Sequence, residues 1–71
     1  MTFEQLQYFI SIVDHDTFFD AAEDLHISQS SLSKQIMRLE RELGLKLFDR
    51  SRRKAAMTDA GAAFYPEAVS L

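Results

Sequence analysis

The 71-residue sequence contains no cysteine. This absence excludes disulfide scaffolds, zinc sites built on cysteine and catalysis by a thiol, and it favours a reducing compartment. No apolar run approaches the roughly 20 residues that cross a bilayer. A charged segment followed by an apolar stretch, the mark of a signal peptide, is also missing. We therefore expect one small intracellular domain with no membrane partner.

Basic residues are missing from both ends of the chain. Residues 1–27 hold six acidic side chains and no Lys or Arg, and residues 55–71 hold two acidic side chains and no basic one. All eight Lys and Arg lie in residues 28–54, where three acidic residues leave a net charge of +5. The net charge of the whole chain, −3, by itself argues against a nucleic-acid partner. This segregation makes residues 28–54 strongly basic. The alternative to a binding role is that these charges form only a solvated face of the domain.

Apolar residues recur at helical spacing in the first two thirds of the sequence. The stripes are Leu6, Phe9, Ile10 and Val13, then Phe18, Ala21, Ala22 and Leu25, then Leu32, Ile36, Leu39 and Leu43. The predicted N-caps are Thr2, Thr17 and Ser28, and Gln5 completes a capping-box pattern with Thr2. The predicted helix ends are Asp16, His26 and Gly44. A short helix joined by a tight turn to a longer one is a helix-turn-helix pattern.

The period changes after Gly44. Residues 45–50 and 54–57 are short extended candidates around a loop, which predicts a small β-hairpin, or wing. Thr58 then caps a last helix that contains Pro66 and reaches the final residue. Its apolar stripe is Ala60, Phe64, Ala68 and Leu71. The predicted fold is mainly α: a winged helix-turn-helix with a three-helix core, over residues 1–57, followed by the start of another helix over 58–71.

The face of the third helix opposite its apolar stripe carries hydroxyl, amide and cationic groups. Gln can bind an adenine edge through two hydrogen bonds, and Ser donates or accepts at most base edges. The free N–H groups at the helix start attract a phosphate. This outer face consists of Ser30, Lys34, Met37 and Arg41, flanked by Ser33 and Arg38, with Gln29 in the first turn. The pattern suits a helix that enters a major groove by its N-terminus.

Four cations cluster at the tip of the predicted wing. They are Arg50, Arg52, Arg53 and Lys54. Their mutual repulsion favours a polyanionic partner, and their length suits an adjacent minor groove. The alternative is a merely solvated loop.

Catalytic and metal-binding patterns are missing. The serines fit no nucleophile motif, and His15 and His26 have no ligand spacing to a carboxylate pattern. We therefore predict no catalytic residue, no metal and no cofactor.

The sequence resembles the N-terminal DNA-binding domain of LysR-type transcriptional regulators, and the resemblance covers essentially the whole chain. It rests on blocks in matching order and spacing: residues 6–9, 18–25, 27–36, 39–44, 47–50 and 57–61. Departures occur at Ser30, where the family usually has Pro, and at Lys34, where it usually has Arg. Lys lacks the guanidinium with which Arg forms two hydrogen bonds at once. We therefore expect these departures to affect which DNA sequence is preferred.

The resemblance implies a role for each matching position. Base-facing residues would be Gln29, Ser30, Ser33 and Lys34. Phosphate-contacting residues would be Ser28, Ser31, Gln35 and Arg38, and wing contacts would be Arg50, Arg52 and Arg53. The last helix would be a linker that pairs with a second copy, with Ala60, Phe64, Ala68 and Leu71 as the dimerisation stripe.

The resemblance also implies partners. These are double-stranded DNA with an interrupted palindrome, a second copy of the chain, and a small-molecule effector bound only by a C-terminal domain absent from these residues. The expected location is the bacterial cytoplasm, at the nucleoid. The alternative from another class is a winged-helix protein-interaction module without DNA binding, which would use the last helix and Phe19.

Overall fold

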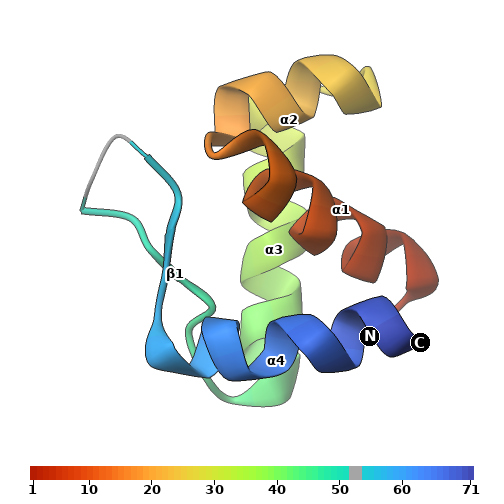
Figure 1. The fold of residues 1–71 in the computed structure, drawn as a ribbon. Coiled ribbons are helices and arrows are strands. Elements are labelled where there is room, and N and C mark those ends of the chain that lie inside the picture. Colours follow the sequence, from red (N-terminus) through yellow and green to blue (C-terminus); the bar gives the residue numbers. More distant parts are fainter. Residues whose placement is uncertain (52–53) are drawn as a thin grey trace.

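The computed structural model describes residues 1–51 and 54–71. Helices α1 (Phe3–His15), α2 (Phe18–Leu25) and α3 (Gln29–Leu43) come first. Strands β1 (Phe48–Asp49) and β2 (Ala56–Met57) follow, and α4 (Asp59–Ser70) completes the chain. Figure 1 shows α3 as the central element, with α2 across one end, α4 across the other and the strands to one side. This arrangement confirms the predicted winged helix-turn-helix.

Each helix begins at the predicted cap. In all four helices a Ser or Thr side chain accepts a hydrogen bond from the backbone N–H three residues later. Thr2 and Gln5 form the complete capping box expected for α1. Asp16, His26 and Gly44 end α1, α2 and α3 in the left-handed conformation, with φ of 67°, 59° and 73°. These caps fix the helix lengths, and thereby the short turn between α2 and α3.

The core lies where α1, α2 and α3 meet. Phe9 is fully buried at its centre, and its ring lies 5.4 Å from that of Phe48 and 5.5 Å from that of Phe64. Ala21 and Ala22 are also buried, so small side chains let α2 pack closely. The other buried apolar residues are Leu6, Ile12, Leu32, Ile36, Leu39, Leu47 and Ala68.

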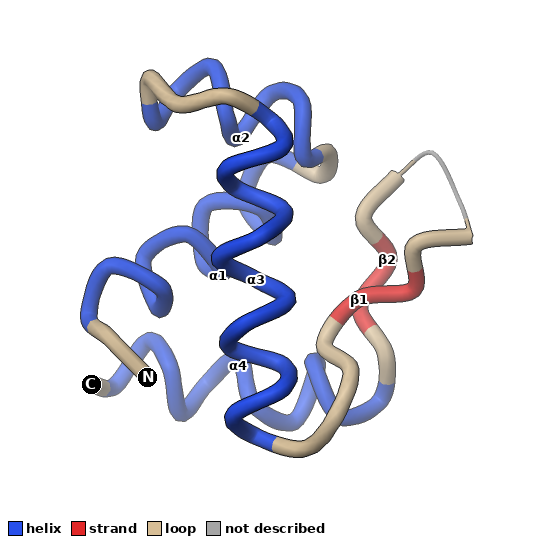
Figure 2. The backbone as a smooth tube through the Cα atoms, turned by 180° about the vertical axis from the view of Figure 1, so that it is seen from behind, coloured by secondary structure: helices blue, strands red, loops and turns tan. Residues whose placement is uncertain are grey.

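The wing is a two-stranded antiparallel ladder in which Phe48 pairs with Met57 and Asp49 with Ala56. The ladder is shorter than the extended segments that we expected, because neighbouring backbone groups bind elsewhere. The N–H of Ala55 donates to the carbonyl of Asp16 at 2.9 Å, outside the hairpin. Figure 2 shows the wing standing beside α3. The wing is therefore held partly by the helical core.

The last helix begins at Asp59, as predicted, and continues through Pro66 to Ser70. Its first turn lies against the backbone at Leu47. Over residues 1–51 and 54–71, no helix is both long and apolar enough to span a membrane.

Candidate nucleic-acid interface

The outer face of α3 is exposed and polar. On the inner side, Leu32, Ile36 and Leu39 are fully buried, which sets the rotation of the helix about its axis. The opposite side chains are consequently held toward solvent. The exposed residues of this face are Gln29, Ser30, Lys34, Met37, Arg38 and Arg41. Three of the four residues predicted to face bases, and the predicted phosphate residue Arg38, therefore lie open on one helix.

Three serine hydroxyls gather at the start of α3. The Ser28 Oγ accepts from the Ser31 N–H at 3.0 Å, and the Ser28 hydroxyl donates to Ser31 Oγ at 2.8 Å. The hydroxyls of Ser28 and Ser30 lie 3.3 Å apart. This exposed cluster surrounds the positive end of the helix dipole, where an anion is favoured. Both serines predicted to contact phosphate belong to the cluster.

Gln35 has a partner inside the protein. Its Oε1 accepts a hydrogen bond from Gln5 Nε2 at 3.2 Å, and Gln5 is a buried residue of α1. Gln35 is half-buried and connects α3 to α1. Its contact with a phosphate stays a prediction, and such a contact has to compete with this hydrogen bond.

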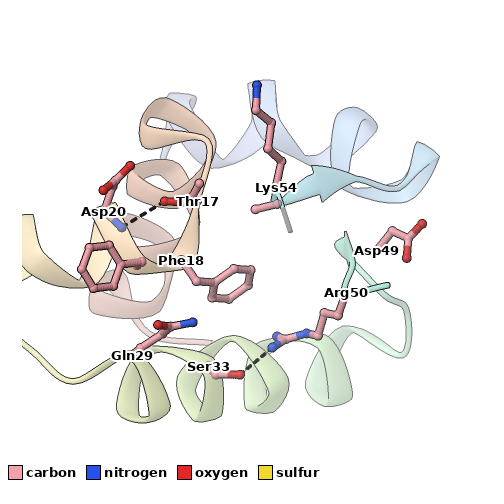
Figure 3. A pocket seen from close by; sticks show the side chains of 10 residues that line it. Thr17, Phe18, Asp20, Gln29, Ser33, Asp49, Arg50 and Lys54 are labelled. Atoms are coloured by element: carbon pink, nitrogen blue, oxygen red, sulfur yellow. Dashed lines mark hydrogen bonds between the residues drawn. The ribbon is translucent and has the colours of Figure 1, made fainter. Parts of the chain in front are cut away.

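Arg50 turns back toward the helices. Its Nη1 donates to Ser33 Oγ, and its Nη2 lies 3.6 Å from Glu40 Oε1. The guanidinium carbon lies 4.8 Å from the centre of the Phe18 ring, within cation–π range. Figure 3 shows Arg50 reaching from the wing to Ser33 on α3. The side chain predicted as a wing contact thus links the wing to α3, and it engages the half-buried Ser33, which was predicted to face a base.

Arg52 and Arg53, the other two predicted wing contacts, lie outside the described residues. Lys54 is described and exposed. It points away from α3 in Figure 3.

Sequence reasoning missed Glu40. Its carboxylate is only 2% exposed, and its Oε2 accepts hydrogen bonds from the N–H groups of Leu47 (2.7 Å) and Phe48 (3.2 Å). A signal was present, because Glu40 follows Ile36 by four residues and Leu39 by one, on the inner side of α3. A carboxylate on an apolar stripe indicates a buried partner.

A cleft of about 510 Å³ separates the wing from the starts of α2 and α3. Figure 3 shows it between Phe18 above, Gln29 and Ser33 below and Arg50 beside them. The exposed ring of Phe19 also lines it. Gln29 and Ser33, both predicted to face bases, line the cleft.

The stripe predicted for dimerisation faces largely inward. Ala68 is 4% exposed and belongs to the core, while Ala60 and Phe64 are half-buried. Leu71 is 70% exposed. Most of this stripe packs α4 onto its own domain, and Leu71 is its one well-exposed member. Pairing of the stripe with a second copy stays a prediction.

The titratable groups form no metal cluster: within the described part of the chain, no three His, Asp or Glu side chains converge. His15 Nε2 lies 3.5 Å from Asp24 Oδ2, and both side chains are well exposed. His26 caps α2, as expected for a helix-end residue.

The three-helix core, the wing and the exposed polar face of α3 define a winged helix-turn-helix protein. Residues 3–62 match the bacterial regulatory helix-turn-helix proteins of the lysR family. The chain belongs to this family, and the predicted resemblance is confirmed.

Relatives of known structure share both fold and sequence. The CbnR DNA-binding domain, solved in complex with DNA, is 40% identical with a TM-score of 0.93, over 99% of this chain and 80% of that one. The BenM DNA-binding domain, solved with catB site 1 DNA, is 40% identical with a TM-score of 0.94, over 99% of this chain and 75% of that one.

A similar sequence is the HTH-type transcriptional regulator TfdT of Cupriavidus pinatubonensis. It is 42% identical over 71 residues, which make up 100% of this chain and 31% of TfdT. The chain thus spans less than a third of the length of this curated relative.

Proposed function

We propose that this chain is the DNA-reading head of a bacterial LysR-type transcriptional regulator. In this proposal α3 enters the major groove of double-stranded DNA, and the wing, residues 49–54, lies at the adjacent minor groove. The observation that carries the proposal is the exposed hydroxyl, amide and cationic face of α3, held outward by a fully buried stripe. Support comes from the two relatives of 40% identity that were solved with DNA.

Each predicted contact has a specific place in this proposal. Gln29, Ser30 and Lys34 read base edges, because their side chains are exposed near the leading end of α3. Ser28 and Ser31 receive a phosphate at the helix start, and Arg38 neutralises another further along. The remaining assignments are Ser33 to a base, Gln35 to a phosphate, and Arg50, Arg52 and Arg53 to the wing contact.

The proposal extends to the protein as a whole. Residues 1–57 would read DNA, and residues 58–71 would begin the linker through which two copies bind an interrupted palindrome. A small-molecule effector would act through a C-terminal domain outside this chain. The regulator would work in the bacterial cytoplasm, at the nucleoid, without catalysis of its own.

The decisive experiment is selection of bound sites from a random duplex pool, followed by a salt titration on the selected duplex. Each phosphate neutralised contributes roughly −0.9 to the slope of log K against log salt. We expect an enriched sequence and a slope of several units. A flat salt response with no enrichment would refute DNA binding and leave the protein-interaction alternative, for which Phe19, 59% exposed, is the leading contact.

Gln29→Ala tests the placement of α3. We expect the variant to lose preference at one base position, at a cost of about 1–3 kcal/mol there, because a base contact is removed. Arg38→Ala should weaken binding to all duplexes alike and lower the salt slope by roughly 0.9. Gln7→Ala, the same truncation at an exposed position of α1, is the matched control. An unchanged preference in Gln29→Ala would refute the assignment of α3.

A further inference from the structure

One buried charge lies directly behind the proposed interface. Among the described residues, Glu40 is the only Asp, Glu, Lys or Arg that is buried. Burial of a carboxylate is costly unless its oxygens find partners. The partners of Glu40 therefore indicate what this charge contributes to the protein.

The two carboxylate oxygens of Glu40 have different surroundings. Oε2 accepts from two consecutive backbone N–H groups, those of Leu47 and Phe48, at the point where the chain enters β1. Oε1 accepts no hydrogen bond from any described group and lies 3.6 Å from Arg50 Nη2. The Glu40 carboxylate thus binds both the backbone at the start of the wing and the side chain of Arg50, the residue that follows β1.

Arg50 extends this connection toward the DNA-facing side of α3. Its guanidinium donates to Ser33 Oγ and lies over the Phe18 ring of α2. The Arg50 guanidinium thus joins the wing to α2 and to Ser33 in the first half of α3. Ser33 is also one of the residues proposed to face a base, so the connection ends at the interface itself.

The hairpin is too small to fix its own position. Its ladder has two residue pairs, and a short isolated hairpin is at best marginally stable in water. Other anchors join the wing to Asp16 and to the start of α4. Glu40 of α3 binds both the backbone that enters the wing, at Leu47 and Phe48, and the side chain of Arg50.

We propose that Glu40 is a positioning residue for sequence-specific DNA binding: it acts through Arg50 to set the place of the wing beside α3. This inference rests on the proposed function. A specific complex needs helix and wing in register with two grooves at once, whereas non-specific binding needs only positive charge near phosphates. Glu40 therefore governs the ratio of specific to non-specific affinity without touching DNA.

Glu40→Gln tests this proposal, because the amide keeps the size of the side chain and one acceptor oxygen but removes the charge that holds Arg50. Affinities are measured for the selected duplex and for an unrelated duplex, at one salt concentration, under conditions where circular dichroism shows the variant folded. We expect specific affinity to fall by about tenfold. Non-specific affinity should stay the same or rise, since Arg50 loses its counter-charge.

The ratio of the two affinities separates positioning from stability. Partial unfolding lowers both affinities by the same factor and leaves the ratio unchanged. Glu42→Gln is the matched control, because it removes the same charge from an exposed position of the same helix. The ratio in this control should equal that of the wild type.

Arg50→Met provides the second variant, at a side chain that is 33% exposed, and it is also measured where circular dichroism shows it folded. It should lower the ratio as Glu40→Gln does, and the double variant should be no worse than either single one. If Arg50 acts only through the direct DNA contact assigned to it in the wing, and not by positioning the wing, its loss lowers both affinities by the same factor and reduces the salt slope by roughly 0.9. That result would overturn the proposal.

An unchanged ratio in Glu40→Gln, or additive effects in the double variant, would also overturn it. If Glu40→Gln does not fold, the ratio and salt slope of Arg50→Met decide alone. Failure of the proposed function looks different, because the wild type itself would then show neither sequence preference nor salt dependence.

Discussion

At the scale of single residues, Tyr65 of α4 meets Asp14 of α1. Its hydroxyl donates to Asp14 Oδ1 at 3.3 Å. The negative charge of Asp14 is the main reason that the pKa of Tyr65 lies above its ordinary value of 10.0, and desolvation and the hydrogen bond add to it. Ionisation of Tyr65 would place two negative charges side by side and remove the donated proton.

Asp14→Asn should lower the pKa of Tyr65 toward its ordinary value. In the wild type, the stabilisation linked to this raised pKa is complete below the unfolded value of about 10 and is lost as pH rises through the folded pKa. Ultraviolet absorbance of tyrosinate during an alkaline titration measures the change. Tyr8 is the internal control, because its raised pKa comes from burial first and then from Glu4. A Tyr65 titration identical in both proteins would contradict the contact.

Residue roles were predictable where they depend on close neighbours in the sequence. The capping box of Thr2 and Gln5 and the helix-end role of His26 are such cases, and both are confirmed. The burial of Glu40 was not recognised, since its partners come from a loop that folds back over the end of α3. The inward turn of Arg50 depends on the same distant contacts.

At the scale of elements, the turn of the helix-turn-helix depends on a residue under conformational strain. His26 ends α2 with φ of 59°, a left-handed conformation that a side chain with a Cβ adopts only at a cost. Glycine occupies the equivalent place after α3, where Gly44 has φ of 73°. The two caps do the same structural task with different residues.

His26→Gly should therefore stabilise the protein by about 1 kcal/mol, through relief of the unfavourable backbone conformation. In a domain of this size, such a gain raises Tm by roughly 4–8 °C. His26→Ala keeps the Cβ and serves as the matched control, with no gain expected. Thermal unfolding followed by circular dichroism compares the three proteins, and a loss of stability in His26→Gly would contradict the argument.

The elements themselves were largely predictable. Each helix shows an apolar period and a cap within a few residues, so all four helices begin at the expected N-caps. The wing was located correctly, but its strands were expected to be longer. Strand length depends on which partner each backbone N–H finds, and Ala55 and Leu47 find theirs outside the ladder.

At the scale of the whole molecule, Gly61 allows the last helix to approach the rest of the domain. A Cβ at this position would lie 2.2 Å from the backbone oxygen of Leu47. That same oxygen accepts a hydrogen bond from the N–H of Thr58 at 3.0 Å, so it has little freedom to move. The contact joins α4 to the segment that leads from α3 into the wing.

Gly61→Ala should destabilise the protein by about 2 kcal/mol or more, because the added methyl group displaces α4 from this backbone. Helix propensity alone predicts the opposite, since Ala is favoured over Gly in a helix by about 1 kcal/mol. Ala63→Gly, at an exposed position of the same helix, is the control and should lose roughly that amount. Urea unfolding measures both variants, and a more stable Gly61→Ala protein would contradict the close approach.

The sequence by itself determined the helices, their caps, the family and the confinement of positive charge to residues 28–54. These features depend on neighbours within a few residues or on motif order, so a linear reading captures them. Only the tertiary structure decided that Ala68 of the expected dimerisation stripe is buried, and that Glu40 and Arg50 connect the wing to α3. Burial and ion pairing depend on residues brought together from distant parts of the chain, and no local pattern specifies which of them will meet.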